Sequence, residues 1–351
     1  MSDDLASLAA YLERAVELAR RGEGHTRPNP PVGAVLVREG RVIGEGWHRR
    51  AGGDHAEVAA IRNAVRRGAS PAGALAVVTL EPCSRPGRVG ACTDALIAAG
   101  VAEVFYAVAD PNPTNRGRAK RVLARAGIRC RCLADASFRR GSEPAARARL
   151  AAAVGAAREL IAPFAKHVTT GRPFVTVKLA MSLDGRICDE RGDAKWISSA
   201  RSRAATGRLR ERVDAIMVGA ETVRRDDPSL LSHGRRNDDL VRVVVSRTGR
   251  LPRKAQVFAD GLNETLVFDD AQKALDELGR AGFLHVLCEG GLSLARSLAD
   301  AGCVDRWLAV TCPVVIGSRP INRALRLRLA DAGILDPASG DRIGCYARSD
   351  S

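Results

Sequence analysis

The sequence predicts a protein of two α/β domains, and three observations lead to this fold class. Short apolar runs alternate with helical patterns from residue 5 to residue 132, which is typical of a layered α/β domain. A second series of the same kind begins at residue 173, after a stretch rich in alanine and arginine from residue 136 to about residue 161. At 351 residues, the chain is long enough for two compact domains with separate cores.

The first half is expected to start with an amphipathic helix, because Leu5, Leu8 and Leu12 recur at helical spacing. Gly68 and Gly127 are expected to end two later helices. The predicted elements are a helix over 5–21, strands over 32–37 and 41–45, a helix over 55–67, a strand over 75–80, a helix over 93–99, a strand over 104–108, a helix over 118–126 and a strand over 128–132.

The second half repeats the alternation of strands and helices. Its predicted elements are a strand over 174–180, a helix over 199–212, strands over 215–218, 241–246 and 265–268, a helix over 271–281, a strand over 285–288, a helix over 292–301 and a strand over 306–310. We expect a first domain over 1–146, an Ala/Arg-rich connector over 147–171 with a helix start near Pro144, and a second domain over 172–351.

The net charge of +15 and the pI near 10.1 favour anionic partners such as nucleic acid, membrane surfaces or phosphorylated small molecules. The alternative is a compositional habit, because arginine greatly outnumbers lysine. The N-terminal stretch opens with acidic residues and lacks an apolar signal core, and no apolar run is long enough to span a bilayer. Nine scattered cysteines fit reduced thiols better than a disulfide framework, so we expect a cytoplasmic protein without a membrane partner.

The strongest chemical signal is the combination of His55, Glu57, Cys83 and Cys92. A catalytic zinc ion takes three protein ligands and keeps one position for water, and one imidazole with two thiolates supplies these three. Zinc lowers the pKa of its water so that hydroxide forms near neutral pH. Glu57 lies two residues beyond His55 at a helix start and is expected to carry protons. This arrangement is typical of enzymes that deaminate nitrogen heterocycles.

Two alternatives apply to these residues. The tripeptide His55-Ala56-Glu57 also occurs by chance, and a lone cysteine is more often a small buried hydrophobe than a ligand. A structural zinc site is disfavoured because a fourth ligand is missing. The positions favour the catalytic interpretation, because the three predicted ligands all lie at the ends of predicted elements, where they can converge at a sheet edge.

The loop between the two cysteines is eight residues long, whereas base deaminases usually have Cys-x-x-Cys. Arg85 and Arg88 lie in this loop and are candidates for a phosphate clamp next to the metal. The alternative is that they are two solvated arginines on the surface. Because both ends of the loop carry predicted zinc ligands, we favour a role in substrate binding.

The second half carries weaker signals. Glu289-Gly290-Gly291 lies between a predicted strand and a predicted helix, where a phosphate can approach a helix N-terminus, although this is equally a plain turn and not a GxGxxG fingerprint. Lys178 lies mid-strand, where a structural ion pair with Asp226 or Glu289 and a substrate role are equally good interpretations. Trp196 could equally be a core residue.

In order along the chain, these motifs resemble those of the bifunctional deaminase/reductase family of riboflavin biosynthesis. The resemblance covers nearly the whole chain and leaves out mainly the stretch 136–160. The matching segments in the first half are PNPPVG (28–33), GEGWH (44–48), HAEV (55–58), TLEPCS (79–84) and DPNP (110–113). Those in the second half are KLAMSLDGR (178–186), WIS (196–198), DAI through Gly219 (214–219), TV (222–223) with DDP (226–228), and EGG (289–291).

The resemblance implies a cytidine-deaminase-like three-layer domain followed by a dihydrofolate-reductase-like α/β domain. It implies that the first domain deaminates a diaminopyrimidinone ribosyl phosphate with zinc, and that the second reduces the ribosyl group to ribityl with NADPH. The implied metal ligands are His55, Cys83 and Cys92, and the implied catalytic residues are Glu57, Lys178 and Asp226. The implied substrate contacts are Asn29, His48, Arg85, Arg88, Arg210, Leu230, His233 and Glu289, and the implied cofactor contacts are Ala180, Trp196, Thr222, Asp226 and Gly291.

Several positions depart from the family pattern and motivate an alternative function. His233 stands where the family has arginine, and Ala194 where it usually has serine. These differences are compatible with a paralogue in a specialised pathway that keeps the deaminase but has an altered or silent reductase. A deaminase that edits RNA is disfavoured by the wide cysteine spacing and by an aromatic content of 4%. We therefore expect a small phosphorylated pyrimidine as substrate, no nucleic-acid partner and, from the family, a homo-oligomer.

Overall fold

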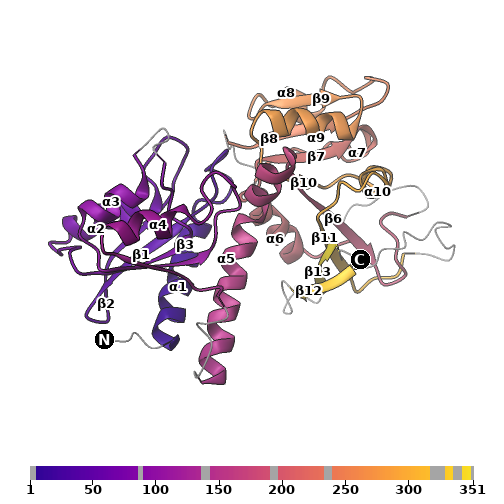
Figure 1. The fold of residues 1–351 in the computed structure, drawn as a ribbon. Coiled ribbons are helices and arrows are strands. Elements are labelled where there is room, and N and C mark those ends of the chain that lie inside the picture. The colour runs from indigo at the N-terminus through magenta and orange to yellow at the C-terminus, as the bar shows by residue number, and fades with distance from the viewer. Residues whose placement is uncertain are drawn as a thin grey trace. The chain divides into compact units, whose positions relative to one another are not determined.

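The computed structural model describes residues 5–85, 90–135, 143–189, 197–232, 239–316, 329–334 and 342–348 (Figure 1). The chain divides into two compact units, Met1–Thr170 and Gly171–Ser351. Among the described residues, no helix combines the length and the apolar character that crossing a lipid bilayer requires.

The first unit is built around a five-stranded sheet in the order β2-β1-β3-β4-β5. Strand β1 is antiparallel to both β2 and β3, and β3, β4 and β5 are parallel. The elements are α1 (Leu5–Arg20), β1 (Gly33–Arg38), β2 (Arg41–Trp47), α2 (Ala56–Arg66), β3 (Leu75–Leu80), α3 (Cys92–Ala98), β4 (Glu103–Val108), α4 (Arg118–Arg125), β5 (Arg129–Cys132) and α5 (Pro144–Thr170). Each element predicted from the sequence between residues 5 and 132 is present within two residues of its predicted ends.

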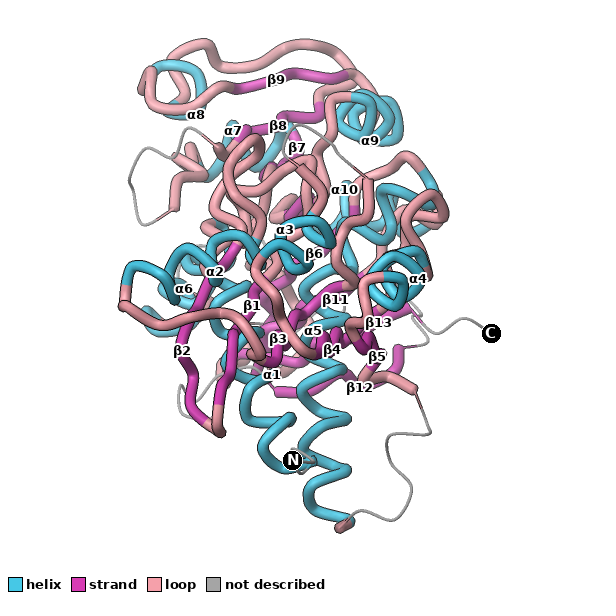
Figure 2. The backbone as a smooth tube through the Cα atoms, turned by 60° about the vertical axis from the view of Figure 1, so that its left-hand side comes forward, coloured by secondary structure: helices cyan, strands magenta, loops and turns pink. Residues whose placement is uncertain are grey.

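Alternating side chains bury both faces of this sheet, because successive residues of a strand point in opposite directions. Val35 and Val77 pack with α1 and α5, whereas Leu36 and Val78 pack with α2, α3 and α4. The first unit therefore has three layers, with the sheet in the middle. Helices α1 and α5 run side by side on one face of it (Figure 2).

The stretch 147–171, expected from its composition as a connector, lies almost wholly within α5. Leu150, Val154 and Leu160 of this helix are buried in the core of the first unit, against α1. The alanines between these residues are small, so α5 can pack closely against its neighbours. They are also good helix formers, and the alanine-rich composition that suggested a linker is therefore that of a packed helix. The compact unit accordingly runs to Thr170.

The second unit contains an eight-stranded sheet in the order β12-β13-β11-β6-β10-β7-β8-β9. Strands β11, β6, β10, β7, β8 and β9 are parallel, and β12 and β13 are antiparallel to their neighbours. The elements are β6 (Phe174–Ser182), α6 (Ala200–Arg210), β7 (Ala215–Gly219), α7 (Ala220–Asp226), β8 (Val241–Val245), α8 (Gln256–Ala259), β9 (Thr265–Phe268), α9 (Ala271–Arg280), β10 (His285–Cys288), α10 (Leu292–Asp300), β11 (Arg306–Cys312), β12 (Leu329–Ile334) and β13 (Arg342–Arg348).

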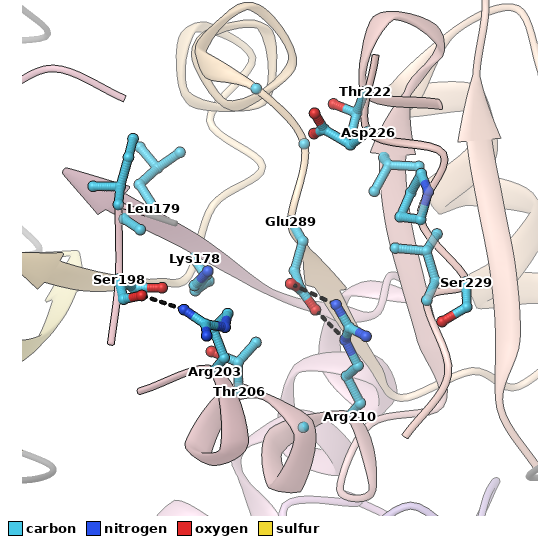
Figure 3. A pocket seen from close by; sticks show the side chains of 18 of the residues that line it. Lys178, Leu179, Ser198, Arg203, Thr206, Arg210, Thr222, Asp226, Ser229 and Glu289 are labelled. Atoms are coloured by element: carbon cyan, nitrogen blue, oxygen red, sulfur yellow. Dashed lines mark hydrogen bonds and ion pairs between the residues drawn. The ribbon is translucent and has the colours of Figure 1, made fainter. Parts of the chain in front are cut away.

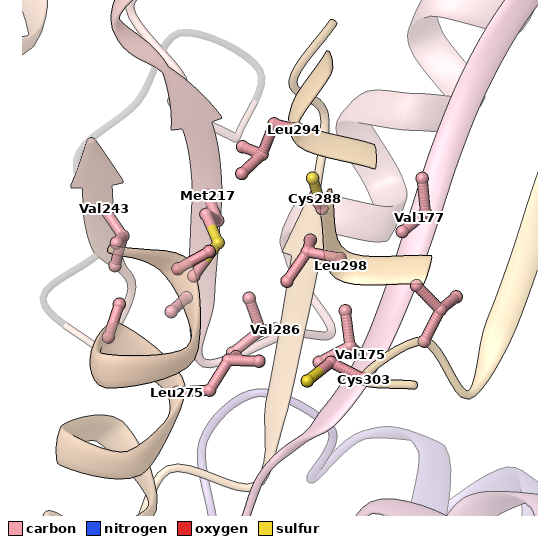
Figure 4. Packing of buried hydrophobic residues seen from close by; sticks show 14 of the residues in the cluster. Val175, Val177, Met217, Val243, Leu275, Val286, Cys288, Leu294, Leu298 and Cys303 are labelled. Atoms are coloured by element: carbon pink, nitrogen blue, oxygen red, sulfur yellow. The ribbon is translucent and has the colours of Figure 1, made fainter. Parts of the chain in front are cut away.

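The core of the second unit also lies on both faces of its sheet. Met217, Val243 and Val286 pack with Leu275 of α9 and with α10 on one face (Figure 4). Ile216 and Val244 lie in a separate cluster on the opposite face. The predicted strands and helices of this half are all present, and α7, α8, β12 and β13 were not predicted. Helices α7 and α8 are only seven and four residues long, which is too short for a helical period to be recognised.

Candidate active sites

Three element ends in the first unit bring His55, Cys83 and Cys92 together. His55 precedes α2, Cys83 follows β3 and Cys92 begins α3. The His55 Nδ1 atom lies 3.2 Å from Cys92 Sγ and 3.5 Å from Cys83 Sγ. The loop is held closed because the Cys92 backbone N–H donates to Cys83 Sγ at 3.2 Å and the Thr93 N–H to the Cys83 carbonyl at 3.1 Å.

The donor atoms fit a zinc ion. The three potential ligand atoms lie within 4.8 Å of one another, and among the described residues this is the cluster able to hold a metal. Tetrahedral zinc with Zn–N near 2.0 Å and Zn–S near 2.3 Å needs ligand atoms roughly 3.5–3.8 Å apart. One imidazole nitrogen and two thiol sulfurs are also the donor types that zinc prefers. Three ligands leave one coordination position for a small molecule, as in catalytic sites.

Glu57 lies in the first turn of α2 and is almost completely buried, with 3% of its surface exposed. Burial raises the pKa of its carboxyl group to about 7, and the neighbouring Cys83 charge acts in the same direction. The position of α2 depends on Gly46 of β2, because a Cβ atom there would lie 2.3 Å from the Ala56 carbonyl oxygen and 2.3 Å from the Ala60 nitrogen. Glycine lets α2 approach the sheet closely and thereby places Glu57.

His48 and Asn29 form a defined hydrogen-bonded pair beside Glu57. His48 Nδ1 lies 3.0 Å from the Asp54 carbonyl oxygen, which can only accept, so Nδ1 carries the proton. Burial lowers the pKa of His48, so the ring is neutral and its Nε2 accepts from Asn29 Nδ2 at 3.1 Å. One of the two N–H groups of the Asn29 amide is therefore used by His48, and the other N–H and the carbonyl oxygen are left for a ligand.

A buried polar network supports the loop that carries Cys83. The Glu81 carboxylate accepts from the backbone N–H groups of Asp110, Gly117 and Ala119. Asn115 Oδ1 accepts from both the N–H and the hydroxyl of Ser84 at 2.9 Å, directly after Cys83. These bonds tie the segment 110–119 to the metal-ligand loop, which a sequence pattern alone does not show.

A cavity of about 100 Å³ opens beside these groups, lined by Asn29, Pro30, Val32, His48, His55, Glu57, Leu80, Glu81, Cys83, Asp110 and Phe164. Five residues predicted for the deaminase site therefore share one cavity. Arg85 is exposed and is not among the described residues that line it, and Arg88 lies outside the described residues. Sequence reasoning missed Phe164, because it belongs to α5, which was expected to be a connector.

The second unit contains a cavity of about 580 Å³ at the ends of β6, β7 and β10 (Figure 3). Eight residues predicted for the reductase site line it: Lys178, Ala180, Arg210, Thr222, Asp226, Leu230, Glu289 and Gly291. Trp196, Ala194 and His233 lie outside the described residues. Figure 3 shows Lys178 and Glu289 directed into the same space, with Thr222 and Asp226 close together on another side of it.

Arg210 and Glu289 are paired with each other in this cavity. Arg210 Nε donates to Glu289 Oε1 at 2.7 Å and its NH2 group to Oε2 at 3.1 Å, while NH1 donates to the Leu231 carbonyl at 3.0 Å. Burial raises the pKa of Glu289, but the charge and hydrogen bonds of Arg210 lower it more strongly, so Glu289 is ionised at neutral pH. A guanidinium has five N–H groups, and two of those of Arg210 remain for a ligand.

Lys178 extends from the middle of β6 and is half-buried. Its ammonium group forms no hydrogen bond or ion pair with another described residue. The structural ion pair of Lys178 with Asp226 or Glu289, one of the two interpretations of the sequence, is therefore not formed in the described part of the chain. A half-buried cation directed into a cavity is suited to an anionic or carbonyl-bearing ligand.

Sequence reasoning also missed Ser198, Arg203, Thr206 and Ser229, which line the same cavity. Arg203 donates to the carbonyl of Ser198. Arg203, Thr206 and Arg210 are spaced three and four residues apart, which places them on one face of α6. This spacing could have indicated a shared helix face. However, α6 is mostly polar, so its functional residues do not stand out from the other polar residues as apolar residues do in an amphipathic helix.

Comparison with known proteins matches both units. Residues 6–108 match the cytidine and deoxycytidylate deaminase zinc-binding region, and residues 173–333 match the RibD C-terminal domain. The riboflavin biosynthesis protein RibD of Bacillus amyloliquefaciens is 36% identical to 88% of this chain, which corresponds to 85% of that protein. RibD of Mycobacterium tuberculosis is 38% identical over 90% of this chain and 88% of its own length. The chain belongs to the RibD family.

A solved RibD-family structure has the same fold. The diaminohydroxyphosphoribosylaminopyrimidine deaminase/5-amino-6-(5-phosphoribosylamino)uracil reductase of Thermotoga maritima superposes with a TM-score of 0.81, at 28% identity, over 98% of this chain and 99% of that one. The predicted fold class, a cytidine-deaminase-like domain followed by a dihydrofolate-reductase-like domain, is confirmed. The prediction of a zinc-dependent deaminase joined to an NADPH-dependent reductase is confirmed as well, and none of these observations favours a specialised paralogue.

Proposed function

We propose that this chain catalyses two successive steps of riboflavin biosynthesis through the residues described above. The first step replaces an amino group of a diaminopyrimidinone ribosyl phosphate with a carbonyl, consuming water and releasing ammonia. The second step adds two hydrogens from NADPH and a proton, converting the ribosyl group to ribityl. The observation that carries the proposal is that both residue sets, each gathered in its own cavity, occur in one member of the RibD family.

In the deaminase site, His55, Cys83 and Cys92 are proposed to hold zinc. A zinc ion with these ligands supplies a water acidic enough to lose its proton near neutral pH. Glu57 is proposed to accept that proton and to deliver protons to the ring nitrogen and to the departing amino group. Burial raises the pKa of its carboxyl group, to about 7 in the metal-free site, and a group that titrates near the working pH both accepts and donates protons readily.

The pyrimidinone ring is proposed to lie between Asn29, His48 and Phe164. The free Asn29 carbonyl oxygen accepts from a ring N–H or amino group, and His48 fixes the orientation of that amide. The Phe164 ring supplies an apolar surface for the flat heterocycle. Arg85 and Arg88 are proposed to bind the phosphate of the ribosyl group outside the cavity, where an exposed guanidinium meets an exposed anion.

In the reductase site, Lys178 and Asp226 are proposed as the catalytic residues and Arg210, Leu230, His233 and Glu289 as substrate contacts. NADPH supplies two electrons with one hydrogen when bound, and Ala180, Trp196, Thr222, Asp226 and Gly291 are proposed to contact it. The Lys178 ammonium can hydrogen-bond the ribosyl oxygen at which negative charge develops and can supply its proton. Glu289 holds Arg210 in a fixed geometry toward the phosphate.

We also propose that the substrate is phosphorylated, that the enzyme works in the cytoplasm as a homo-oligomer, and that nucleic acid is not a substrate. A phosphorylated small molecule agrees with the net charge of +15. The described cysteines are all free thiols, as expected in a reducing compartment. Light scattering on the purified protein tests the oligomeric state, and a filter-binding titration with single-stranded RNA tests the last point.

The deciding experiment supplies the zinc-loaded protein with the diaminopyrimidinone ribosyl phosphate, with and without NADPH, and follows products by mass spectrometry. Loss of one amino group without NADPH, followed by gain of two hydrogens with it, supports the proposal. Deamination that stops before reduction would contradict the reductase half. An unchanged substrate, with protein shown to contain zinc, would contradict the substrate class.

A further inference from the structure

Asn115 lies in the turn between β4 and α4 and is buried, with 7% of its surface exposed. Its side chain reaches the segment that follows β3, in which Cys83 stands between Pro82 and Ser84. Residues 81–84 belong to no helix or strand. The position of Cys83 therefore depends on hydrogen bonds that come from outside this segment.

The amide of Asn115 uses its oxygen twice and its nitrogen twice. Oδ1 accepts from the backbone N–H and from the hydroxyl of Ser84, both at 2.9 Å. Nδ2 donates to Asp110 Oδ2 at 2.9 Å and to the Pro82 carbonyl at 3.4 Å. A backbone N–H can only donate and a carbonyl can only accept, so these partners fix which end of the amide faces Ser84.

These hydrogen bonds bracket Cys83, because one goes to the residue before it and two go to the residue after it. The Cys83 carbonyl accepts in addition from the Thr93 N–H at 3.1 Å. An amide held from both ends cannot rotate without losing hydrogen bonds, and each lost bond leaves a buried polar group without a partner. The amide therefore fixes the backbone from which the Cys83 thiol extends.

The turn that carries Asn115 is itself held by short hydrogen bonds. The Asn115 N–H donates to the Asn112 carbonyl at 3.0 Å, and the Arg118 N–H donates to the Asn115 carbonyl at 3.0 Å. Asp110 Oδ1 accepts from the Asn112 N–H at 2.8 Å, which also orients the carboxylate that receives the Asn115 amide. The side chain of Asn115 thus extends from a fixed turn and transmits its position to the loop.

We propose that Asn115 is a positioning residue of the metal site, which holds Cys83 through Pro82 and Ser84 and thereby slows the release of zinc. The proposal rests on the proposed deaminase function, in which Cys83 is a zinc ligand. It adds a residue that is neither one of the grouped ligands nor among the described residues lining the cavity of the deaminase site. Removing a group that orients a metal ligand typically lowers metal affinity by about 10- to 100-fold.

The test measures zinc release from the zinc-loaded full chain into an excess of a coloured chelator. We expect Asn115→Ala to release zinc about tenfold faster or more, because Cys83 is no longer held from both sides. Protein loaded with cobalt in place of zinc should show a changed visible absorption in this variant, since that absorption depends on the geometry of the thiolate ligands.

Two further variants separate the contributions of the partners. Ser84→Ala should accelerate release less than Asn115→Ala, because the bond from the Ser84 N–H remains. Adding Ser84→Ala to Asn115→Ala should change nothing more, since the two residues act through one contact. If Asn115→Ala does not fold, Asn115→Asp replaces it. This variant keeps the acceptor for Ser84 but places an oxygen opposite the Asp110 carboxylate, so zinc release should again be faster.

Asn63→Ala is the matched control. Asn63 is a half-buried asparagine of α2 in the same unit, and its Oδ1 accepts from the Glu45 N–H at 3.0 Å. It is not among the described residues that line the cavity of the deaminase site. Asn63→Ala should lower the midpoint of urea unfolding, as a lost structural hydrogen bond does, and should leave zinc release and the cobalt absorption unchanged.

Three results overturn the inference. Unchanged zinc release and cobalt absorption in a folded Asn115 variant would mean that Asn115 does not position Cys83. Equal acceleration in Asn115→Ala and Asn63→Ala would mean that the general loss of stability controls release. Failure of the unmodified protein to bind zinc would contradict the proposed deaminase function together with this inference, and it is distinguished from the first two results because no variant is involved.

Discussion

The carboxylate of Glu289, at the end of β10, is bound by the guanidinium of Arg210, at the end of α6, through two hydrogen bonds of 2.7 and 3.1 Å. The two residues are 79 positions apart in the sequence. Only 9% of the Glu289 side chain and 20% of the Arg210 side chain are exposed. The pair therefore joins the residue after β10 to α6, the helix that also carries Arg203 and Thr206 of the same cavity.

Glu289→Gln should abolish reduction and leave deamination unchanged, because it leaves the Arg210 charge buried without its counter-ion. Breaking a buried ion pair from one side lowers the free energy of unfolding by about 3 kcal/mol. Asp276→Asn is the matched control, since Asp276 pairs with Arg172 on the surface at 2.7 Å and such pairs contribute less than about 1 kcal/mol. Steady-state kinetics and urea unfolding measure both effects. Equal losses in the two variants would contradict the importance of the buried pair.

Glu57→Gln should reduce deamination by a factor of about 10² to 10⁴, because the amide keeps the shape of the side chain but cannot accept the proton. Zinc content should remain stoichiometric, since Glu57 is not among the three grouped ligands. NADPH oxidation on the deaminated substrate should also be unchanged. Asp94→Asn, an exposed carboxylate in the first turn of α3, is the control and should retain full activity. A joint loss of both activities in Glu57→Gln would mean that the two sites are not independent.

Cys83→Ser should lose the metal, because a serine hydroxyl is a far weaker zinc ligand than a thiolate. Elemental analysis of the dialysed protein should give a zinc content well below one per chain. Cys132→Ser is the control, since Cys132 lies on β5 of the same unit and is not part of the ligand cluster. Stoichiometric zinc in Cys83→Ser would exclude Cys83 from the ligand set.

Gly46→Ala should displace α2 and destabilise the first unit, because the added Cβ would lie 2.3 Å from two backbone atoms of that helix. Overpacking of this kind costs about 1–3 kcal/mol. Since His55 precedes α2 and Glu57 lies in its first turn, we also expect weaker zinc retention and slower deamination. Gly155→Ala on α5 is the control, because nothing lies within 4 Å of the added Cβ there. It should leave stability unchanged or raise it slightly. Normal activity in Gly46→Ala would show that α2 adjusts without cost.

The stability of the second unit should fall as the pH is lowered from about 6.5 toward 3. Burial lowers the pKa of His285 on β10 to about 3, and the charge of Arg306 acts in the same direction. The folded pKa lies below the unfolded one, so the unfolded chain binds the extra proton throughout this window and is favoured there. For an unfolded pKa of 6.5, this contributes a loss of about 2 kcal/mol by pH 5.

His285→Gln removes this titration while allowing the hydrogen bond to Thr176 Oγ1, which is 2.9 Å long in the unmodified protein. Urea unfolding at pH 7.5 and pH 5 should show a smaller pH dependence for this variant. A Trp47→Phe background makes the fluorescence report on the second unit, because Trp196 and Trp307 are the remaining tryptophans. An identical pH dependence with and without His285 would contradict the prediction.

The grouping of His55, Cys83 and Cys92 could be predicted because it depends on local relations. His55 and Glu57 are two residues apart, and the two cysteines flank a single loop between predicted elements. The strands and longer helices were also predictable, since their apolar residues recur with periods of two or about 3.6 residues. Other features left no such local mark. Phe164 lines the deaminase cavity but belongs to α5, which was predicted from its composition to be a connector. Helices α7 and α8 are too short to show a helical period.

The fold class, the family and the donor types of the metal site could all be inferred from the sequence, because each depends on particular residue types at short, regular spacing. The pairing of Arg210 with Glu289, and the lack of an ion pair between Lys178 and either acidic candidate in the described part of the chain, became visible in the three-dimensional structure alone. The physical reason is the strand order of the second sheet. The chain forms β7, β8 and β9 before returning to place β10 between β6 and β7, so residues far apart in sequence meet at one edge.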